Sequence, residues 1–247
     1  MTAQKTIFAW SGGKDSAVAL HELQKRQQYK VLALLTTITK DYDRISMHGV
    51  RRSLLEQQAD SLGLILEKIY ISKDSSYAEY EAKMKEALQR YKKSGVSSVA
   101  FGDIFLEDLK KYREENLSKL GMKGIFPIWK MDTKYLASLF IESGFKSVIT
   151  CVDTNVLDKT FAGREFNEEF ISSLPPCVDP CGENGEFHSF VYDGPIFQKK
   201  ILFERGEKVL RNDRFYYCDL VPMSRPQLSK NSRETPMICA PTTEDCT

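Results

Sequence analysis

The chain has 247 residues, enough for one large domain or two modest ones with a hydrophobic core. Its 35 Lys and Arg residues nearly balance 34 Asp and Glu residues, which leaves a formal net charge of +1. This balance disfavours tight, sequence-independent binding to nucleic acid, because such binding draws on excess positive charge. The 42% hydrophobic and 11% aromatic composition is that of a globular protein.

The N-terminal sequence and the cysteines predict a cytoplasmic protein without a membrane partner. The first residues lead directly into a strand-like run, without the long apolar stretch of a secretory signal. The longest apolar run, Val31–Leu35, is far too short to span a bilayer. The six cysteines occur late in the chain without the spacing of a disulfide scaffold, so we expect reduced thiols.

Strand-like and helix-like patterns alternate over the first 150 residues. The predicted strands are Lys5–Trp10, Val31–Thr37, Leu64–Ile71, Ser97–Phe101, Ile125–Ile128 and Ser147–Val152. The predicted helices cover Lys14–Gln28, Val50–Leu62, Tyr77–Tyr91, Phe105–Leu120 and Thr133–Glu142. This alternation predicts a Rossmann-like α/β fold, in which helices cover both faces of a parallel, twisted sheet.

The pattern changes after about Asp153. A short polar helix is expected at Gly163–Leu174. Antiparallel strands are then expected at Phe187–Tyr192, Ile196–Phe203, Lys208–Leu210 and Phe215–Val221, with Gly-Glu and Asn-Asp turns between them. We therefore divide the chain into an α/β domain at 1–130, a smaller α+β substrate-binding domain at 131–223, and a tail at 224–247 whose polar sequence predicts disorder.

The strongest chemical signal is Ser11-Gly12-Gly13-Lys14-Asp15-Ser16, between the first predicted strand and helix. Glycines allow a tight turn there, and the free N–H groups at a helix start bind anions. Lys14 adds a positive charge for a phosphate, while Asp15 and Ser16 are suited to cap the helix or hold magnesium. An ordinary strand-to-helix turn is the alternative. In a parallel sheet this position lies at the carboxyl edge, where ligands bind.

The loop fits neither the G-x-x-x-x-G-K-[ST] pattern nor the G-x-G-x-x-G dinucleotide pattern. It resembles the S-G-G-x-D-S loop, or PP-loop, of the ATP pyrophosphatases. The resemblance implies that residues 1–130 form an ATP-binding domain of the adenine nucleotide alpha hydrolase-like type. Members of that superfamily cut ATP between its α- and β-phosphates and release AMP and pyrophosphate. Adenylation suits a carboxylate, whose oxygen must become a good leaving group before an amine replaces it.

Further motifs narrow the resemblance. They are Phe101-Gly102-Asp103-Ile104, Arg113-Glu114, Pro127-Ile128-Trp129, Asp179-Pro180-Cys181-Gly182-Glu183-Asn184-Gly185-Glu186-Phe187-His188 and Asp193-Gly194-Pro195. Together with the PP-loop they look like the diphthine-ammonia ligase family, from Lys5 to about Val221. That family uses ATP to join ammonia to the carboxylate of diphthine, a modified histidine on translation elongation factor 2.

The loop from Gly182 to Ser189 departs from the family pattern. It reads Gly-Glu-Asn-Gly-Glu-Phe-His-Ser, whereas members that act on diphthine typically show Gly-Glu-Gly-Gly-Glu-Tyr-Glu-Thr. This variant looks like a bacterial branch, and bacteria lack diphthamide. A link to cobalamin salvage has been proposed for that branch. The resemblance therefore implies amidation either of diphthine or of another acid, such as a cobalamin-related carboxylate.

Matching positions assign roles to individual residues by this resemblance. ATP would be bound by Ser11, Gly12, Gly13, Lys14, Asp15, Ser16, His48, Gly102 and Asp103. Asp15 would also hold magnesium, and Asn184, Gly185 and His188 would contact the substrate. Glu183 and Glu186 would act with Lys14 and Asp15 in catalysis, by binding ammonium or taking its proton, because an attacking amine must be neutral. The alternatives are a hydrogen-bonded loop histidine for His48 and solvated acids for Glu183 and Glu186.

Other functions remain as alternatives. Cys177-x-x-x-Cys181 with His188 has a spacing that zinc sites allow, but no convincing second pair follows, so this interpretation is the less favoured one. A tRNA-modifying PP-loop enzyme would need a basic path that a +1 chain hardly offers. A nucleotide-sensing protein would bind ATP or AMP without cleaving it. The leading prediction is a cytoplasmic ATP-dependent ligase that amidates a small-molecule or protein side-chain carboxylate with ammonia, as a monomer or a homo-oligomer.

Overall fold

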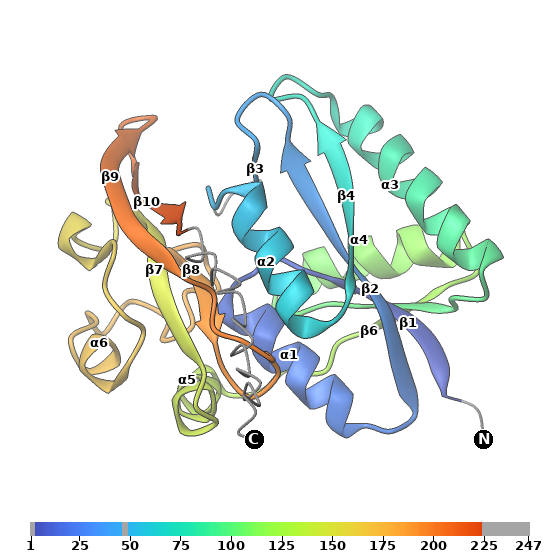
Figure 1. Cartoon of the computed structure of the whole chain (residues 1–247), viewed down its shortest axis with the longest axis horizontal. Coiled ribbons are helices and arrows are strands. Elements are labelled where there is room, and N and C mark those ends of the chain that lie inside the picture. Colours follow the sequence, from blue (N-terminus) through green and yellow to red (C-terminus); the bar gives the residue numbers. More distant parts are fainter. Residues whose placement is uncertain (1–2, 46–48, 224–247) are drawn as a thin grey trace, which may run out of the picture.

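The computed structural model describes residues 3–45 and 49–223. His48 and the predicted tail at 224–247 lie outside these residues. The described chain forms two sheets with helices around them (Figure 1). The larger sheet carries the Ser11–Ser16 loop, and strand β8 of the smaller sheet packs against the helix that follows this loop.

The larger sheet is built by the first half of the chain. Its strands are β1 (Gln4–Ala9), β2 (Tyr29–Thr39), β3 (Arg44–Ile45), β4 (Ile65–Ile71), β5 (Ser98–Ala100) and β6 (Lys123–Ile125). Its helices are α1 (Lys14–Lys25), α2 (Arg52–Leu62), α3 (Tyr77–Lys93) and α4 (Glu107–Ser118). The left-handed cap predicted at Gly63 ends α2 with a φ of 67°.

The strand order creates a crevice between β1 and β5. Parallel strands follow the order β4-β2-β1-β5-β6, and β3 pairs antiparallel with the end of β2. The chain adds β2 and β4 on one side of β1 and then returns to add β5 on the other. Such a reversal opens a crevice at the carboxyl ends of the two strands, where α/β proteins bind ligands. Ser11 and Phe101 follow these two strands.

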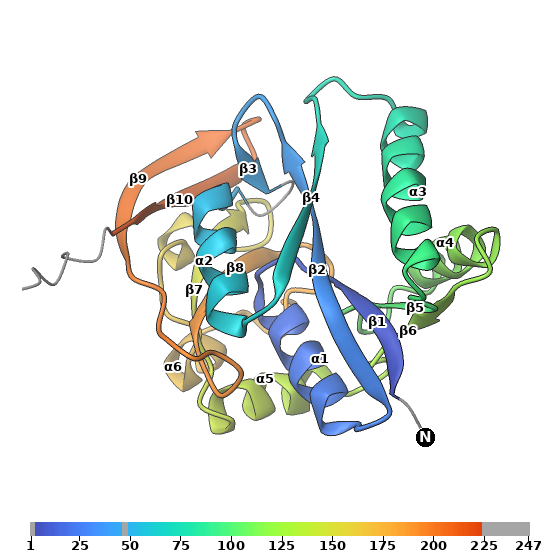
Figure 2. The same ribbon diagram turned by 45° about the vertical axis from the view of Figure 1, so that its right-hand side comes forward.

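Alternate residues of the central strands bury their side chains on opposite faces of the sheet. Phe8 and Leu34 belong to the buried cluster that includes α1 and α2, whereas Ile7 and Ala33 belong to the cluster under α3 and α4. Figure 2 shows the two helix pairs on opposite faces. The predicted α/β fold with helices on both faces of a mostly parallel sheet is confirmed.

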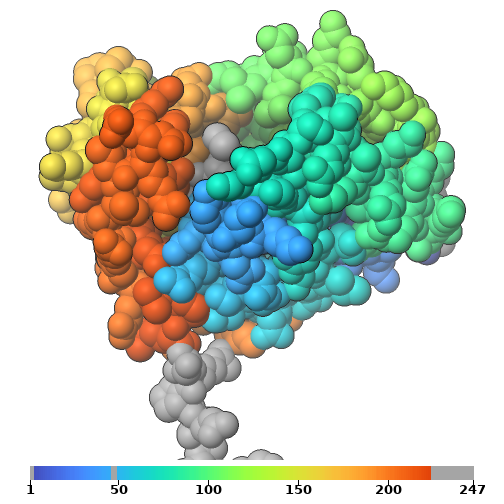
Figure 3. Space-filling model, turned by 90° about the horizontal axis from the view of Figure 1, so that it is seen from above, coloured from blue at the N-terminus to red at the C-terminus, as the bar shows by residue number. Residues whose placement is uncertain are grey.

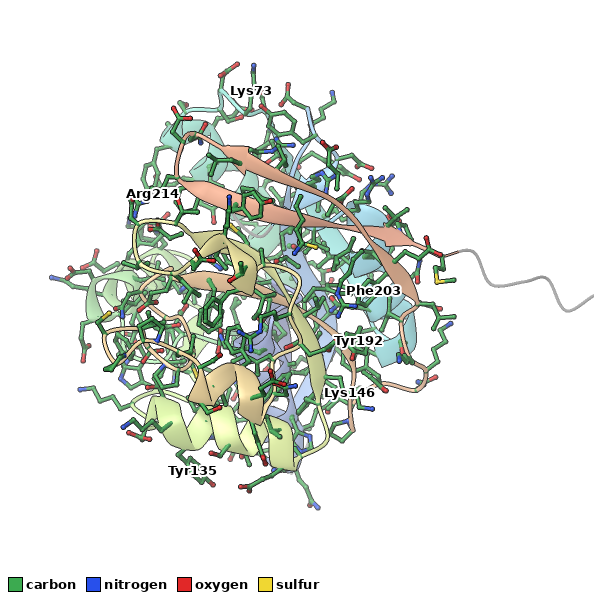
Figure 4. All side chains as sticks on the ribbon, turned by 90° about the vertical axis from the view of Figure 1, so that its left-hand side faces the viewer. Lys73, Tyr135, Lys146, Tyr192, Phe203 and Arg214 are labelled. Carbon is green, nitrogen blue, oxygen red and sulfur yellow. The ribbon has the colours of Figure 1, made fainter. Side chains whose placement is uncertain are left out.

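The second sheet is antiparallel, with the order β8-β7-β10-β9. Its strands are β7 (Lys146–Asp153), β8 (Phe187–Asp193), β9 (Phe203–Arg211) and β10 (Phe215–Pro222). The helical pieces of this half are α5 (Thr133–Glu142), the 3-10 turn η1 (Lys159–Phe161) and α6 (Glu168–Ser172). Figure 4 looks onto this sheet, where the rings of Tyr192 and Phe203 lie 5.3 Å apart.

The two sheets share a hydrophobic core. Leu54 and Leu55 of α2 belong to the same buried cluster as Phe190 and Val191 of β8. The predicted domains at 1–130 and 131–223 therefore stay a prediction, since no gap in the core marks their boundary.

Two predicted elements of the second half are wrong. The helix expected at Gly163–Leu174 is reduced to α6, because Phe166 N donates to Ser147 O of β7 at 2.9 Å and holds the preceding chain extended. The strand expected at Ile196–Phe203 is an irregular segment. Its backbone binds α2 instead of a strand, with Gln198 N donating to Ser61 O at 2.9 Å.

Three other predictions differ locally from the structure. The turn expected at Gly206 is absent, since β9 runs through this residue and pairs with β10 on both sides of it. The strand expected at Ile125–Ile128 ends at Ile125, and Pro127, which lacks an N–H group, follows in a turn. Strand β3 is only two residues long and was not predicted.

The helices in the described ranges 3–45 and 49–223 lack the combination of length and apolar character that a membrane-spanning segment requires.

Replacing Phe170 by Ala tests the core of the second half. Phe170 is fully buried, and its ring centre lies 5.2 Å from that of Phe187. We expect Phe170→Ala to lower the free energy of unfolding by about 3–5 kcal/mol, because the cost of losing the buried ring adds to the cost of the cavity that it leaves. Urea denaturation measures this change. Tyr135→Ala, at a position 56% exposed on α5, should stay within about 0.5 kcal/mol of the wild type. Equal effects of the two changes would contradict the described packing.

Candidate active site

A cavity of about 590 Å³ lies at the carboxyl edge of the larger sheet. Figure 3 looks down on this edge of the molecule. One end of the cavity is polar and is lined by Gly102, Asp103 and residues of the loop before β8. Ser11, Lys14, Asp15 and Ser16 of the PP-loop also line it, whereas Gly12 and Gly13 do not. The other end is apolar and reaches between the sheet, α3 and α4. Its side chains include Leu35, Tyr80, Met84, Leu88, Val99 and Leu109.

The Ser11–Ser16 loop turns tightly into α1. Gly12 has a φ of 78°, a conformation that favours glycine, and α1 begins at Lys14 without a side-chain cap. The Ser11 hydroxyl lies 2.8 Å from that of Ser16 and accepts from Gly13 N at 3.2 Å. This helix start lines the cavity, where backbone N–H groups and the α1 dipole favour an anion, so the anion site stays a prediction that this geometry allows.

Gly102 permits a close approach between β5 and α1. A Cβ atom at Gly102 would lie 3.0 Å from Ser16 N and 3.1 Å from Asp15 C, both backbone atoms. Asp103, the next residue, is held by Arg113, whose Nε lies 2.7 Å from Asp103 Oδ2. The Arg113 guanidinium in turn lies 4.3 Å from the centre of the Phe101 ring. Gly102 and Asp103 therefore line the cavity beside the helix start, and their contact with a nucleotide stays a prediction.

Lys14 is a buried cation, with only 4% of its surface exposed. Its Nζ donates to Asp15 Oδ2 at 2.9 Å and to the carbonyl oxygen of Cys181. It also lies 5.1 Å from the centre of the Phe187 ring. Burial lowers the pKa of Lys14, but the nearby Asp15, Cys181 and Glu183 groups outweigh burial, so the pKa lies above its ordinary value. Lys14 thus stays charged and ties the helix start to the loop before β8.

The loop from Asp179 to Glu186 is held in shape by its own acids and glycines. The Asp179 carboxylate accepts from Cys181 N at 2.8 Å and from Glu183 N at 3.3 Å. Gly182 has a φ of 65°, and a Cβ atom there would lie 2.9 Å from the Phe187 ring. Gly182 therefore serves a close backbone approach, as the sequence indicates, whereas Gly185, with a φ of 90° and no atom within 4 Å of a Cβ position, serves only the turn.

Glu183 lies between the two halves of the molecule. Its Oε1 accepts from Ile104 N, in the segment after β5, at 2.8 Å. It lines the same cavity as Asp15 and Ser16. Burial, together with the negative charge of Asp15, raises the pKa of Glu183 to about 7. A carboxyl group with this pKa gains and loses a proton near neutral pH.

The other predicted residues of this loop differ in their orientation. Glu186 is 6% exposed and does not line the cavity. Its Oε1 accepts from Asp179 N at 3.1 Å and from Asn184 Nδ2 at 3.0 Å, so both side chains brace the loop. Gly185 and His188 do line the cavity. Burial and the Lys14 charge lower the pKa of His188 to about 4, which leaves its imidazole neutral.

Sequence reasoning missed the role of Gln58, a fully buried residue of α2. Its Oε1 accepts from Trp10 Nε1 at 2.8 Å, and its Nε2 donates to Gly12 O at 3.0 Å and to Val191 O at 2.6 Å. The available signal was a glutamine on the apolar face of a predicted helix. Arg113 was noted only as part of a motif, without its ion pair to Asp103.

The thiol pair offers no metal centre in the described chain. Residues 3–45 and 49–223 contain no group of three or more His, Cys, Asp or Glu side chains arranged to hold a metal. Cys181 directs its thiol to Thr133 O at 3.3 Å, and Cys177 is exposed. Asp15 remains suited to magnesium, because that ion takes as few as one protein carboxylate beside phosphate oxygens and water.

Comparison with known proteins gives the family. Residues 4–124 match the sequence model of the Diphthamide synthase N-terminal domain, and residues 132–221 match that of the Diphthamide synthase C-terminal domain. The chain belongs to the diphthamide synthase family. The two matches together cover the polar cavity end, the PP-loop and the loop before β8.

Relatives of this family member carry the name diphthine–ammonia ligase. The Danio rerio protein is 26% identical over 226 residues, which cover 82% of this chain and 88% of the relative. The Schizosaccharomyces pombe protein is 28% identical over 225 residues, 83% of this chain, but the chain spans only 37% of that relative's length. A solved structure, the U34-tRNA thiolase NcsA of Methanococcus maripaludis, matches 56% of this chain and 55% of its own at 17% identity and a TM-score of 0.35.

Gly102→Ala tests the approach of β5 to α1. The added methyl group would push against backbone atoms of Asp15 and Ser16 and displace the helix start. We expect ATP binding to weaken about 10- to 100-fold, because a displaced helix start would no longer align its N–H groups with the phosphates. Isothermal titration calorimetry with a non-hydrolysable ATP analogue measures this affinity. Gly206→Ala on β9, which would meet side chains of β10 instead, is the matched control. Unchanged affinity in Gly102→Ala would place the phosphates elsewhere.

Proposed function

We propose that this member of the diphthamide synthase family is an ATP-dependent ligase that amidates a carboxylate with ammonia. Family membership and relatives named diphthine–ammonia ligase support a C–N bond-forming ligase. One structural observation carries the proposal: Glu183 and the PP-loop face the same cavity. An anion site for the nucleotide and a carboxyl group with a pKa of about 7 are thereby placed within one reaction space.

The two ends of the cavity suit the two parts of ATP. The polar end offers the α1 start, the Ser11–Ser16 loop and buried Lys14 to the phosphates. The apolar end, between the sheet, α3 and α4, suits a purine ring. ATP would then lie across the crevice between β1 and β5 with its phosphates beside Gly102.

In the first proposed step, a carboxylate oxygen of the acid attacks the α-phosphorus. The bond from this phosphorus to the bridging oxygen breaks, and pyrophosphate leaves. Negative charge builds on the phosphate oxygens, and the α1 N–H groups and Lys14 stabilise it without reorganisation. Asp15 would hold Mg²⁺ here, and the ion would neutralise charge on the departing pyrophosphate.

In the second proposed step, ammonia attacks the acyl carbon of the adenylate, AMP leaves with one oxygen of the original carboxylate, and the nitrogen gives up a proton to solvent as the amide forms. Ammonium has no lone pair, so it must lose a proton first. We assign this proton to Glu183, whose pKa of about 7 suits a general base. Glu186 and Asn184 act as positioning residues that hold the loop carrying Glu183. Neutral His188 offers the substrate a hydrogen-bonding partner at the cavity wall.

We place this reaction in the cytoplasm. The four cysteines of the described chain, Cys151, Cys177, Cys181 and Cys218, are free thiols, which suits a reducing compartment. The acid is a small molecule or a protein side chain. This chain has Asn184 where members that act on diphthine typically have glycine, so both diphthine and other acids are candidate substrates.

The products of ATP cleavage test the proposed function. Purified protein is incubated with α-labelled ATP, Mg²⁺, ammonium and a panel of carboxylic acids. We expect AMP and pyrophosphate, in amounts equal to the amide formed, with the true substrate. Labelled ADP in place of AMP would contradict cleavage at the α-phosphorus. Tight AMP binding with no turnover on any acid would favour a nucleotide-sensing protein instead.

The pH dependence tests the role of Glu183. Because its pKa is about 7, the carboxylate form needed for proton removal is lost below that pH. We expect kcat/KM to fall about tenfold per pH unit below 7 and to level off above it. Glu183→Gln should lose most of the activity together with this limb of the profile. A variant that keeps the wild-type profile would exclude Glu183 as the base.

The raised pKa of Glu183 also predicts how the free energy of unfolding changes with pH. A carboxyl group whose pKa is raised in the folded state favours folding when protonated. The contribution of Glu183 is therefore fully present below the unfolded pKa of about 4.3 and is lost as pH rises through about 7. We expect the wild type to lose stability relative to Glu183→Gln across this window in urea titrations. A difference that is constant with pH would contradict the raised pKa.

A further inference from the structure

A second cavity, of about 260 Å³, lies between the two sheets. One wall comes from the end of β2 and from β3, and the other from the β9–β10 hairpin. Its polar and aromatic lining includes Thr39, Tyr42, Arg44, Arg211, Asn212 and Tyr217. Ile45 lines both this cavity and the main one, so its side chain is a shared wall. A ligand in the second cavity would therefore lie next to the main cavity.

The charges around this cavity do not cancel. Arg44 Nη1 lies 2.7 Å from Asp219 Oδ1, and Arg51 Nη2 lies 2.6 Å from Asp219 Oδ2. Burial raises the pKa of Asp219, but the bonds from Arg51 and Arg44 outweigh it and hold the pKa at about 2. Asp219 is thus always ionised near neutral pH. One carboxylate shared by two guanidinium groups still leaves one positive charge in excess.

Arg211 adds a second excess charge. Within the described chain it makes no ion pair with a carboxylate. Its guanidinium lies 5.8 Å from the centre of the Tyr42 ring and 6.0 Å from that of Tyr217, so two aromatic faces flank it. Asp213, in the hairpin turn nearby, does not line the cavity, and Asp43 is paired with Arg52. Asp219 is the one acid among the lining residues given for this cavity.

The aromatic wall is fixed by the backbone. Gly49 has a φ of 67°, and a Cβ atom there would lie 2.8 Å from the Tyr217 ring. The ring therefore rests directly on the backbone, and no other residue type would allow this position without a shift. Tyr42, by contrast, is 52% exposed and stands at the cavity mouth. The two rings hold Arg211 between them, and its guanidinium offers planar, charge-assisted N–H donors to an anion.

We propose that this second cavity binds an anionic group of the acid substrate other than the carboxylate that reacts. The inference rests on the proposed function, since it places the reacting carboxylate in the main cavity beyond Ile45. Arg211 and Arg44 supply the positive charge, and Asn212 supplies a polar group at the wall. The substrate class is then an acid with at least two anionic groups, such as a polycarboxylate or a phosphorylated carboxylate.

Direct binding tests the site without turnover. The full chain is saturated with a non-hydrolysable ATP analogue, so that the PP-loop is filled, and titrated with citrate in a calorimeter. We expect Arg211→Gln to weaken citrate binding at least about tenfold, the loss of one charge-assisted contact. Arg211→Lys should keep part of the affinity. Arg214→Gln is the matched control, because Arg214 lies on the same hairpin, pairs with Asp153 and does not line the cavity.

Two results would overturn the inference. One is citrate binding of equal strength in the wild type and Arg211→Gln, and the other is no binding to either. Steady-state kinetics distinguish a failure of the proposed anion site from a failure of the proposed ligase function. With mono- and dicarboxylic acids that support AMP release, Arg211→Gln should raise KM only for the dicarboxylic acids, at nearly constant kcat. Absence of AMP release with every acid, while citrate binding still depends on Arg211, would contradict the ligase but keep the anion site.

Discussion

The buried amide of Gln58 is the interaction on which the site depends. Gly12 O accepts from Gln58 Nε2 at 3.0 Å and from Val191 N of β8 at 2.9 Å, so the PP-loop is fixed to helix α2 and to the second sheet. A buried carbonyl left without these partners would cost about 1–3 kcal/mol, which is why the loop holds one shape. The loop in turn sets where α1 begins, and we propose that phosphates bind at the start of α1. In this proposal the second sheet is part of the nucleotide site.

A second constraint is the charge enclosed around Lys14. A buried ammonium is costly unless it is paired, and here Asp15 and the Cys181 carbonyl pair it. Its charge lowers the pKa of two neighbouring groups. It adds to burial in lowering the pKa of His188, and it limits the rise in the pKa of Glu183, which burial and Asp15 drive upward. The pKa of about 7 for Glu183 is therefore a property of the assembled site.

The sequence predicted those features that depend on local pattern. Strand and helix periodicity gave the parallel sheet, and Gly182 correctly indicated a close backbone approach, although Gly185 on the other side of Glu183 makes none. What it missed depends on partners distant in the chain. Gln58 looks like any residue on an α2 face until Trp10 and Val191 are placed around it. The irregular segment after β8 likewise follows from Ser61, more than a hundred residues earlier.

Oxygen transfer tests the central claim, adenylation of a carboxylate in this cavity, most directly. The acid that supports AMP release is labelled in both carboxylate oxygens with oxygen-18 and converted in a single turnover with ATP and ammonium. Mass spectrometry of the products follows the label. The account predicts one labelled oxygen in AMP and one in the amide, because the attacking oxygen stays on the α-phosphorus. Label in inorganic phosphate, or none in AMP, would contradict it.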